Sequence, residues 1–397
     1  MRKAILSILG GAIFLLPLMF ASCGNIDNPL EIIDTSGSGG GGGGAEETTT
    51  ISYVEYSVSG ETATPTTKTL AEGAYTVVTA DLAELTAAKP YVVNTDVTID
   101  HDITLSGDAE IIICDGKTLI VNGKMNDATP LSPTTKLVVY GQSGKSGSLN
   151  VSCTDAADAT MAISVKEFNI HGAKVISSSD NSKTGQAIHV EEDFNLYEAN
   201  VTVTAPGEDT QATEVFGIVN VYKGSVLKST GNMNGLMTGT LNIYGGDVTI
   251  NGGVLGTTIA PLTGAGADGI NGSVKITSGS LYVKGGDAKA SSNKNGGKGI
   301  AGGGTLTING GTVEIIGGNG DGTGNGGVGI EATTIVTDCV KVTATGGDGD
   351  TKGGCFSGYV TPANTLKYSD DDGASYTNSD GSAQLFSMIP KMIIIPQ

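Results

Sequence analysis

LNIYGGDV, at residues 241–248, has a pattern that recurs along most of the chain. It reads as an alternating apolar and polar strand, a two-residue turn and the start of a second alternating strand. Alternation with a period of two buries one face of a strand and exposes the other. The same frame fits FNIHGAKV (168–175), FNLYEANV (194–201), VNVYKGSV (219–226), VKITSGSL (274–281) and LTINGGTV (306–313). Self-similarity of this kind predicts a repeat architecture.

The spacing of the copies indicates the kind of repeat. The fourth residue of the frame recurs at intervals of 22 to 33 residues, at Cys114, Tyr140, His171, Tyr197, Tyr222, Tyr244, Thr277 and Asn309. Constant strands with loops of changing length are typical of a parallel β-helix, because coils stack at ~4.8 Å while insertions project at a corner. We expect an all-β, right-handed, single-stranded parallel β-helix (solenoid) of about eight or nine coils with terminal caps. A β-sandwich or propeller would need more regular spacing or blade signatures.

Composition narrows the fold class and the partners. Glycine supplies 62 of the 397 residues, which argues against a helical protein because glycine is costly inside helices. The formal net charge is −19, and Arg2 is the only arginine. A surface of this sign repels phosphate groups, so the sequence excludes nucleic acid as a partner.

The first 50 residues read as a targeting segment and a linker. Residues 1–22 have a basic start, an apolar stretch and small residues before Cys23, and resemble the signal peptide of a bacterial lipoprotein with Cys23 as its lipidation site. An ordinary secretory signal is the alternative. Residues 23–50 contain six consecutive glycines, Gly39 to Gly44, and predict a flexible tether. We expect an exported protein, lipid-anchored to the outer membrane and facing the cell surface.

The rest of the chain divides into three expected parts. These are an N-terminal cap with the first strands over 51–107, the parallel β-helix over 108–360 and a C-terminal cap hairpin over 361–397. Residues 369–376 (SDDDGASY) resemble an Asp-box turn, which we expect to stabilise the terminal hairpin. Export permits disulfides, but Cys114, Cys153, Cys339 and Cys355 allow three pairings, and the sequence does not choose among them.

Three stretches carry a resemblance to a known family. They are YVVNTDVTIDHDITLSGDAEIIICDGKTLIVNG (91–123), VYGQSGKSGSLNV (139–151) and GIAGGGTLTINGGTVEIIGG (299–318). Each is similar to the carbohydrate-binding-type parallel β-helix modules of gut bacterial surface lipoproteins, and the similarity extends over about 85–347. The resemblance implies the same fold and a role in polysaccharide binding or adhesion. Its motifs are turns and strands, so it assigns no binding residue.

The first candidate site is a column of aromatic side chains. Its members follow inward-pointing apolar residues and therefore point outward: Tyr140, His171, Tyr197, Tyr222 and Tyr244. Flat aromatic rings suit the apolar faces of sugars, and the tyrosine hydroxyl adds a polar group. These five residues are the predicted carbohydrate-binding site. The alternative is that the rings stack on one another and stiffen the solenoid.

The second candidate site is acidic. Oxygen-bearing side chains follow Gly-Gly pairs at equivalent ends of successive coils: Asp287, Asn319, Asp321, Asp348 and Asp350. Ca²⁺ prefers six to eight oxygen ligands, so these residues are a candidate calcium site. A calcium ion would also let an acidic protein bind an acidic polysaccharide. The alternative is that Asp and Asn act here as ordinary turn formers.

These observations favour a non-catalytic, polysaccharide-binding surface lipoprotein. The alternative is an adhesive or structural surface protein with a protein partner. A pectin-active lyase or hydrolase is disfavoured because the chain after residue 22 has no arginine and its carboxylates fall mostly in turns.

Overall fold

The computed structural model describes residues 50–154, 160–180, 185–207, 210–255, 264–370, 372–386 and 389–397. The predicted signal peptide, the lipidation site Cys23 and the tether up to residue 49 therefore lie outside the described residues. The described chain is all-β, with no helix among its elements, so it holds none long and apolar enough to cross a membrane.

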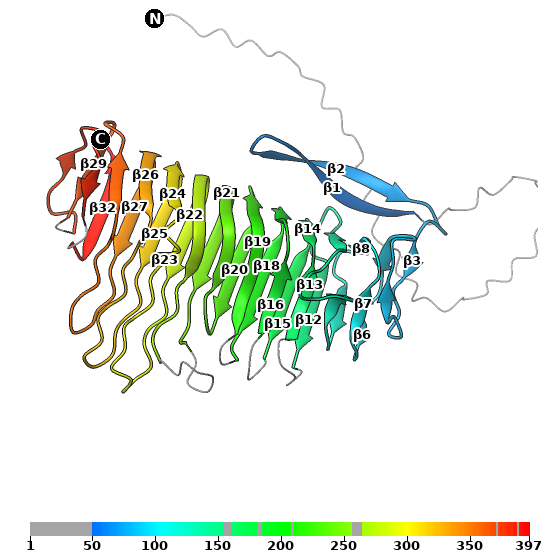
Figure 1. Cartoon of the computed structure of the whole chain (residues 1–397). Coiled ribbons are helices and arrows are strands. Elements are labelled where there is room, and N and C mark those ends of the chain that lie inside the picture. The colour runs from blue at the N-terminus through cyan, green and yellow to red at the C-terminus, as the bar shows by residue number, and fades with distance from the viewer. Residues whose placement is uncertain are drawn as a thin grey trace, which may run out of the picture. The chain divides into compact units, whose positions relative to one another are not determined.

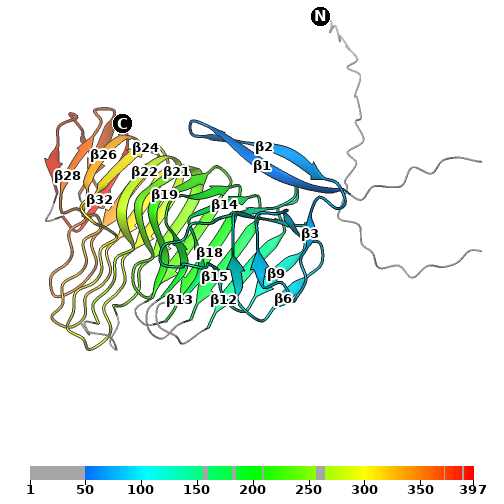
Figure 2. The ribbon, with the colours of Figure 1, turned by 45° about the vertical axis from the view of Figure 1, so that its right-hand side comes forward.

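Parallel pairing organises the strands into three stacks of one hydrogen-bonded system of 30 strands (Figures 1 and 2). The first stack, which we call the ladder sheet, contains β3 (Thr76–Val77), β5 (Tyr91–Val93), β8 (Ala109–Ile113), β11 (Lys136–Tyr140), β14 (Glu167–His171), β17 (Phe194–Tyr197), β24 (Thr305–Asn309), β26 (Thr333–Asp338) and β28 (Tyr359–Pro362). The second stack contains β6 (Val97–Ile99), β9 (Thr118–Val121), β12 (Ser148–Cys153), β15 (Lys174–Ser179), β18 (Asn200–Ala205), β20 (Val226–Gly231), β25 (Thr312–Ile316) and β27 (Lys341–Thr345). The third contains β4 (Glu84–Leu85), β7 (Ile103–Leu105), β10 (Met125–Asp127), β13 (Thr160–Val165), β16 (Gly185–Val190) and β23 (Ile300–Ala301).

Three long strands pass from one stack to the next. They are β19 (Gln211–Tyr222), β21 (Leu236–Asn251) and β22 (Ile270–Lys284). β21, for example, pairs with β22 through Leu236, Leu241 and Val248 in turn, with register shifts where the chain bends. The arrangement confirms the all-β class and the parallel, solenoid-like stacking expected from the repeat.

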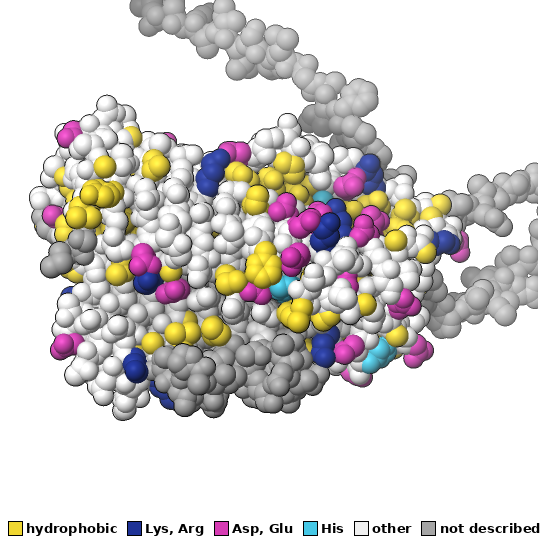
Figure 3. Space-filling view, viewed as in Figure 1, with side chains coloured by type: hydrophobic (Ala, Val, Ile, Leu, Met, Phe, Trp, Pro, Cys, Tyr) yellow, Lys and Arg dark blue, Asp and Glu magenta, His cyan; other side chains and the backbone are white. Residues whose placement is uncertain are grey.

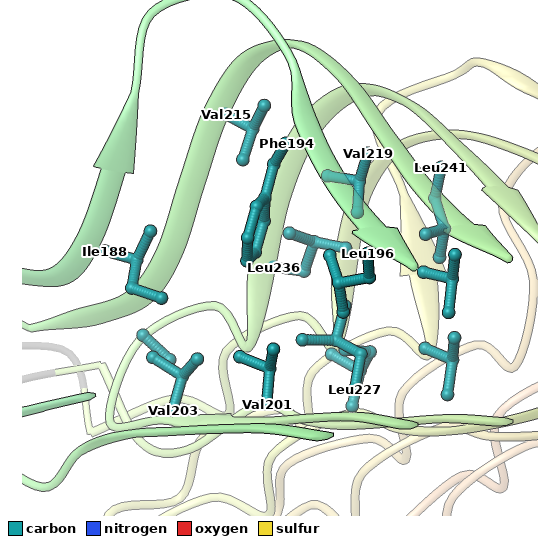
Figure 4. Close-up of a cluster of buried hydrophobic side chains, with 14 of the residues drawn as sticks. Ile188, Phe194, Leu196, Val201, Val203, Val215, Val219, Leu227, Leu236 and Leu241 are labelled. Atoms are coloured by element: carbon teal, nitrogen blue, oxygen red, sulfur yellow. The ribbon is translucent and has the colours of Figure 1, made fainter. Parts of the chain in front are cut away.

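Inward apolar residues of successive copies stack in register and form the core. Phe168 pairs with Phe194, and Phe194 with Val219, so the first position of the repeat becomes one continuous buried column. The two phenylalanine rings are stacked with centroids 5.3 Å apart. Figure 4 shows Phe194 and Val219 among the apolar side chains that point into the interior between the strands. Removal of this apolar surface from water is the main source of stability.

The N-terminal segment differs from the expected end cap. β1 (Ile51–Ser59) and β2 (Thr62–Leu70) form an antiparallel hairpin. This hairpin lies along the outside of the ladder sheet (Figures 1 and 2), and β1 donates a hydrogen bond from Val54 N to Gly141 O. Parallel pairing starts at β3, within the segment 51–107 expected to hold the first strands. The hydrophobic side chains of the hairpin pack on the outer face of the ladder sheet and not on the end of the solenoid.

Antiparallel strands cover the open edges at the C-terminal end. β32 (Lys391–Pro396) pairs with β27, and β31 (Gln384–Leu385) pairs with β28. β29 (Leu366–Ser369) pairs with both β30 (Thr377–Asn378) and β32. In the intervening Asp-box-like turn, the Gly373 amide donates to Ser369 Oγ at 2.9 Å. Edge strands that would otherwise template aggregation are thus paired within the chain.

The two cysteines nearest the C-terminus are not joined to each other by a disulfide. Cys339 and Cys355, like Cys153, are buried free thiols. Burial raises the pKa of Cys339 to about 11 and that of Cys355 to about 12, so both stay protonated at neutral pH.

Glycines form a tightly packed corner in the later coils. Backbone amides and carbonyls alternate between outgoing and returning chains at N–O distances of 2.7 to 2.9 Å, through Gly253, Ala267, Gly286, Gly297, Gly318, Gly327, Gly347 and Gly353. The loops that follow β22, β25 and β27 accordingly run side by side (Figure 1). A Cβ on Gly286 would lie 1.6 Å from Gly253 O, and one on Gly318 would lie 1.8 Å from Gly286 O. Only glycine permits this approach.

We predict that Gly286→Ala destabilises the solenoid by at least about 1–3 kcal/mol, because backbone atoms must separate to admit the methyl group. The measurement is the fall in thermal midpoint followed by circular dichroism. Gly303→Ala is the control, since a Cβ there meets nothing within 4 Å and adds only the strain of a positive φ. Equal effects of the two substitutions would contradict the packing argument.

Candidate functional site

The structure brings the five predicted aromatic residues into one continuous stack. Ring centroids are 4.9 Å apart for Tyr140 and His171, 4.6 Å for His171 and Tyr197, and 4.9 Å for Tyr197 and Tyr222. Tyr222 and Tyr244 follow at 5.3 Å with a larger tilt of 35°. The rings meet because each occupies the same outward position on adjacent parallel strands.

The hairpin covers most of this aromatic column. Tyr140, His171, Tyr197 and Tyr222 are only 5 to 8% exposed, whereas Tyr244 is half-buried. Tyr53 of β1 packs on Tyr140 with centroids 4.8 Å apart, and Tyr56 stacks parallel to Tyr197 at 6.0 Å. Ring faces therefore contact one another and the hairpin. These contacts are the ones expected if the rings stack on one another and stiffen the solenoid. Sugar stacking on the column stays a prediction.

Hydrogen bonds fix the hairpin to the column. The Tyr56 amide donates to His171 Nδ1 at 3.0 Å, and Gln142 Nε2 donates to Ser52 O at 2.8 Å. Near the far end of the hairpin, Lys275 Nζ lies 3.0 Å from Glu61 Oε1. Because His171 Nδ1 accepts this hydrogen bond, the neutral ring carries its own proton on Nε2.

A ladder of asparagines runs beside the aromatic column on the same sheet face. Asn195 donates to Asn169 Oδ1 at 2.8 Å, Asn220 to Asn195 Oδ1 at 2.8 Å, and Asn242 to Asn220 Oδ1 at 3.0 Å. The ladder ends on Glu167, which accepts from Asn169 at 2.7 Å. Sequence reasoning missed this feature, although its signal is the asparagine at the second position of FNIH, FNLY, VNVY and LNIY.

A cavity of about 660 Å³ opens between the hairpin, the loop 86–90 and the ladder sheet. Its lining includes three of the predicted residues, Tyr140, His171 and Tyr197, but neither Tyr222 nor Tyr244. Its further polar lining, which the sequence did not reveal, consists of Glu55, Thr86, Lys89, Asp108, Glu110, Lys136, Glu167, Asn169 and Asn195. Figure 3 shows acidic and lysine side chains gathered in this area, over β8 and β14 in Figure 1.

Burial shifts the titration of several groups around the cavity. It raises the pKa of Glu110, with the nearby Glu55 carboxylate adding to the effect and Lys136 opposing it. Burial, aided by Lys136, lowers the pKa of His171 to about 4. Burial also raises the pKa of Tyr140 and Tyr197 above their ordinary value, so both hydroxyls stay protonated. At neutral pH the cavity thus presents a neutral imidazole and phenols beside carboxylates.

The candidate calcium ligands lie in the glycine-rich loops and hold neighbouring coils together. Asp287 Oδ1 accepts from the Asn319 amide at 2.7 Å, and Asn319 Oδ1 accepts from the Asp348 amide at 2.9 Å. Asp321 accepts from the Ser292 amide at 2.8 Å, while the Asp350 amide donates to Gly324 O. Within the described residues no group of three or more His, Cys, Asp or Glu side chains could hold a metal. The observed contacts are those of turn-forming side chains, and calcium binding stays a prediction.

A second polar cluster lies on the third stack. His189 Nδ1 is 3.0 Å from Glu214 Oε2, which also accepts from Gln186 at 2.9 Å, and Phe216 packs edge-on against the imidazole. The sequence showed no partner for His189, because Glu214 follows one full coil later. With His189 only 2% exposed, the pair is enclosed by protein and is separate from the cavity on the ladder sheet.

We predict that acid loosens the hairpin. The folded protein favours neutral His171, so its contribution is complete above the unfolded pKa of about 6.5 and is lost as pH falls towards about 4. The protection factor of the Tyr56 amide, which compares its exchange rate with the intrinsic rate at the same pH, should fall over this interval. His171→Asn keeps an acceptor but does not titrate, so it should remove this fall. An unchanged pH profile in the variant would show that another group is responsible.

We also predict that Asn195→Ala costs about 1–3 kcal/mol, because it leaves Asn169 Oδ1 and the Asn220 amide without their shared partner in a largely buried row. Chemical denaturation measures the loss. Asn251→Ala is the matched control, since its side chain makes only a long 3.5 Å contact with exposed Thr230. A cost below that of the control would show that the ladder adds no stability.

Comparisons with protein-family models, with curated proteins and with solved structures found no match for this chain. The resemblance to carbohydrate-binding β-helix modules therefore has no support from these comparisons.

Proposed function

We propose that this protein is a non-catalytic, polysaccharide-binding surface protein and that the cavity beneath the hairpin is its binding site. The observation that carries the proposal is the cavity itself, which combines aromatic side chains with amides and carboxylates on one face of a stacked sheet. Sugar rings need both apolar contact and dense hydrogen bonding. The cavity volume of about 660 Å³ lies within the range typical of small-ligand binding sites.

Rigidity supports the same function. The lining residues stand on β8, β11, β14 and β17, which pair in register, and on the loop 86–90. The asparagine ladder and the aromatic stack hold the side chains of these strands in place before any ligand arrives. Such preorganisation lowers the conformational cost of binding.

The proposal keeps the features that the sequence predicts and the described residues do not test. These are export, lipid attachment at Cys23 to the outer membrane, exposure at the cell surface, about eight or nine coils and a right-handed turn, which is the usual hand of parallel crossovers. Calcium remains a proposed aid to binding an acidic glycan. The absence of catalysis is tested separately, by incubating the protein with pectins and assaying new unsaturated or reducing ends.

One observation favours an adhesive function as the second candidate. Tyr359 and Leu385 are paired across β28 and β31, and each is almost 60% exposed. Ile335 on the adjacent β26 is also exposed. Exposed apolar side chains that cluster are typical of protein-binding surfaces. Cell binding that survives glycan removal and is lost in Tyr359→Ser would favour this function.

We predict that the protein binds glycans on an array. Ala88→Trp should weaken this binding at least tenfold, because an indole on this exposed lining residue fills the mouth of the cavity. Ala290→Trp, on an exposed loop away from the cavity, is the control and should bind normally. Parallel arrays with Ca²⁺ and with chelator separate calcium-dependent from direct recognition. No glycan bound in either condition would overturn the proposal.

A further inference from the structure

The charges around the cavity are unequal. Four carboxylates line it, those of Glu55, Asp108, Glu110 and Glu167, against the two ammonium groups of Lys89 and Lys136. The surrounding chain has a net charge of −19, so its field adds to the excess of negative charge. An anionic sugar entering this cavity would be repelled.

Both lysines already have partners within the protein. Lys136 Nζ lies 3.0 Å from Glu167 Oε1, and Lys89 Nζ donates to Gly73 O at 2.6 Å. Recruiting either ammonium to a ligand carboxylate would break an existing contact. The cavity therefore offers no free cation to an acidic glycan.

Glu110 is the lining carboxylate that is left without a partner. Among the described residues it makes no hydrogen bond and no ion pair, although it is partly buried. Glu55, on the covering hairpin, lies close enough to raise the pKa of Glu110 and is itself held by Lys68 only through a half-exposed pair at 3.4 Å. Ion pairs this exposed to solvent contribute little free energy, so Lys68 does not neutralise Glu55 strongly. A cation placed near both carboxylates would relieve their repulsion.

His171 supplies an independent polar group directed at a ligand. Its side chain is 93% buried and lines the cavity, and its Nδ1 is occupied by the Tyr56 amide. Nε2 then carries the proton of the neutral ring and has no hydrogen-bond partner among the described residues. Nε2 is not one of the fully buried atoms that lack a partner, so it is open to the cavity and can donate to a ligand acceptor such as a sugar hydroxyl or ring oxygen.

We propose that the cavity recognises an amino sugar with a free amine, whose ammonium lies near Glu110 and Glu55 while a sugar oxygen accepts from His171 Nε2. The inference rests on the proposed carbohydrate binding at this cavity and names the ligand class. It narrows the polysaccharide expected from sequence to a cationic one. No metal ion is required for this recognition.

The test is calorimetric titration of the whole chain with two β-1,4-linked glucosamine oligomers of equal length, one with free amines and one fully N-acetylated. We expect the free-amine oligomer to bind at least tenfold more tightly. Glu110→Gln should remove that preference, so that the two oligomers bind the variant with comparable affinity. Glu314→Gln, an exposed carboxylate on the second stack, is the matched control and should keep the preference.

Non-specific attraction of a polycation to an acidic protein needs its own control. A lysine oligomer with the same number of charges measures that attraction, and Ala88→Trp should affect only the sugar. Equal binding of both sugar oligomers, or equal binding of the lysine oligomer, would overturn the inference and leave carbohydrate binding standing. Failure of every glycan to bind would instead overturn the proposed function.

Discussion

In-register stacking of successive coils is the constraint on which the rest of the structure depends. Each strand must place an apolar side chain over the one in the preceding coil, as Phe168, Phe194 and Val219 do. The repeat distance between strands is set by backbone hydrogen bonds at ~4.8 Å, so every position of the repeat becomes a column. Columns that face inward form the core, and columns that face outward bring similar side chains into direct contact.

The outward columns explain the candidate site. Aromatic rings at one position become a stack, and asparagines two residues earlier become a hydrogen-bonded ladder. Neither needs a loop to position it, because the sheet itself supplies the geometry. The hairpin then uses the aromatic column as a docking surface, and the space left beside β1 becomes the cavity. A single sheet face thus provides both a structural contact and a candidate binding surface.

Much of this could be predicted from the repeat, and some of it could not. Alternation and spacing predict the parallel stacking and the meeting of Tyr140, His171 and Tyr197. They do not predict that β1 covers these rings, because β1 lies far away in sequence and contacts Gly141, His171 and Tyr197 on successive coils. Asp287 and Asn319 share their pattern with metal ligands, yet here they accept from backbone amides of the next coil. Turn formers and oxygen ligands are the same residue types, so pattern alone does not separate them.

The sequence by itself determined the stacking fold, because a period-two pattern repeated at variable intervals of a few dozen residues buries its apolar face when successive copies stack. It also determined where glycine is required, since the Gly-Gly pairs coincide with the corner where backbones approach most closely. Only the tertiary structure decided which outward groups are covered and which are free. Within the described part of the chain Glu110 makes no hydrogen bond or ion pair, and His171 has one nitrogen engaged and one open, because of where the hairpin lies. That position follows from the packing of Tyr53 and Tyr56 on the aromatic column, a long-range contact with no local signature.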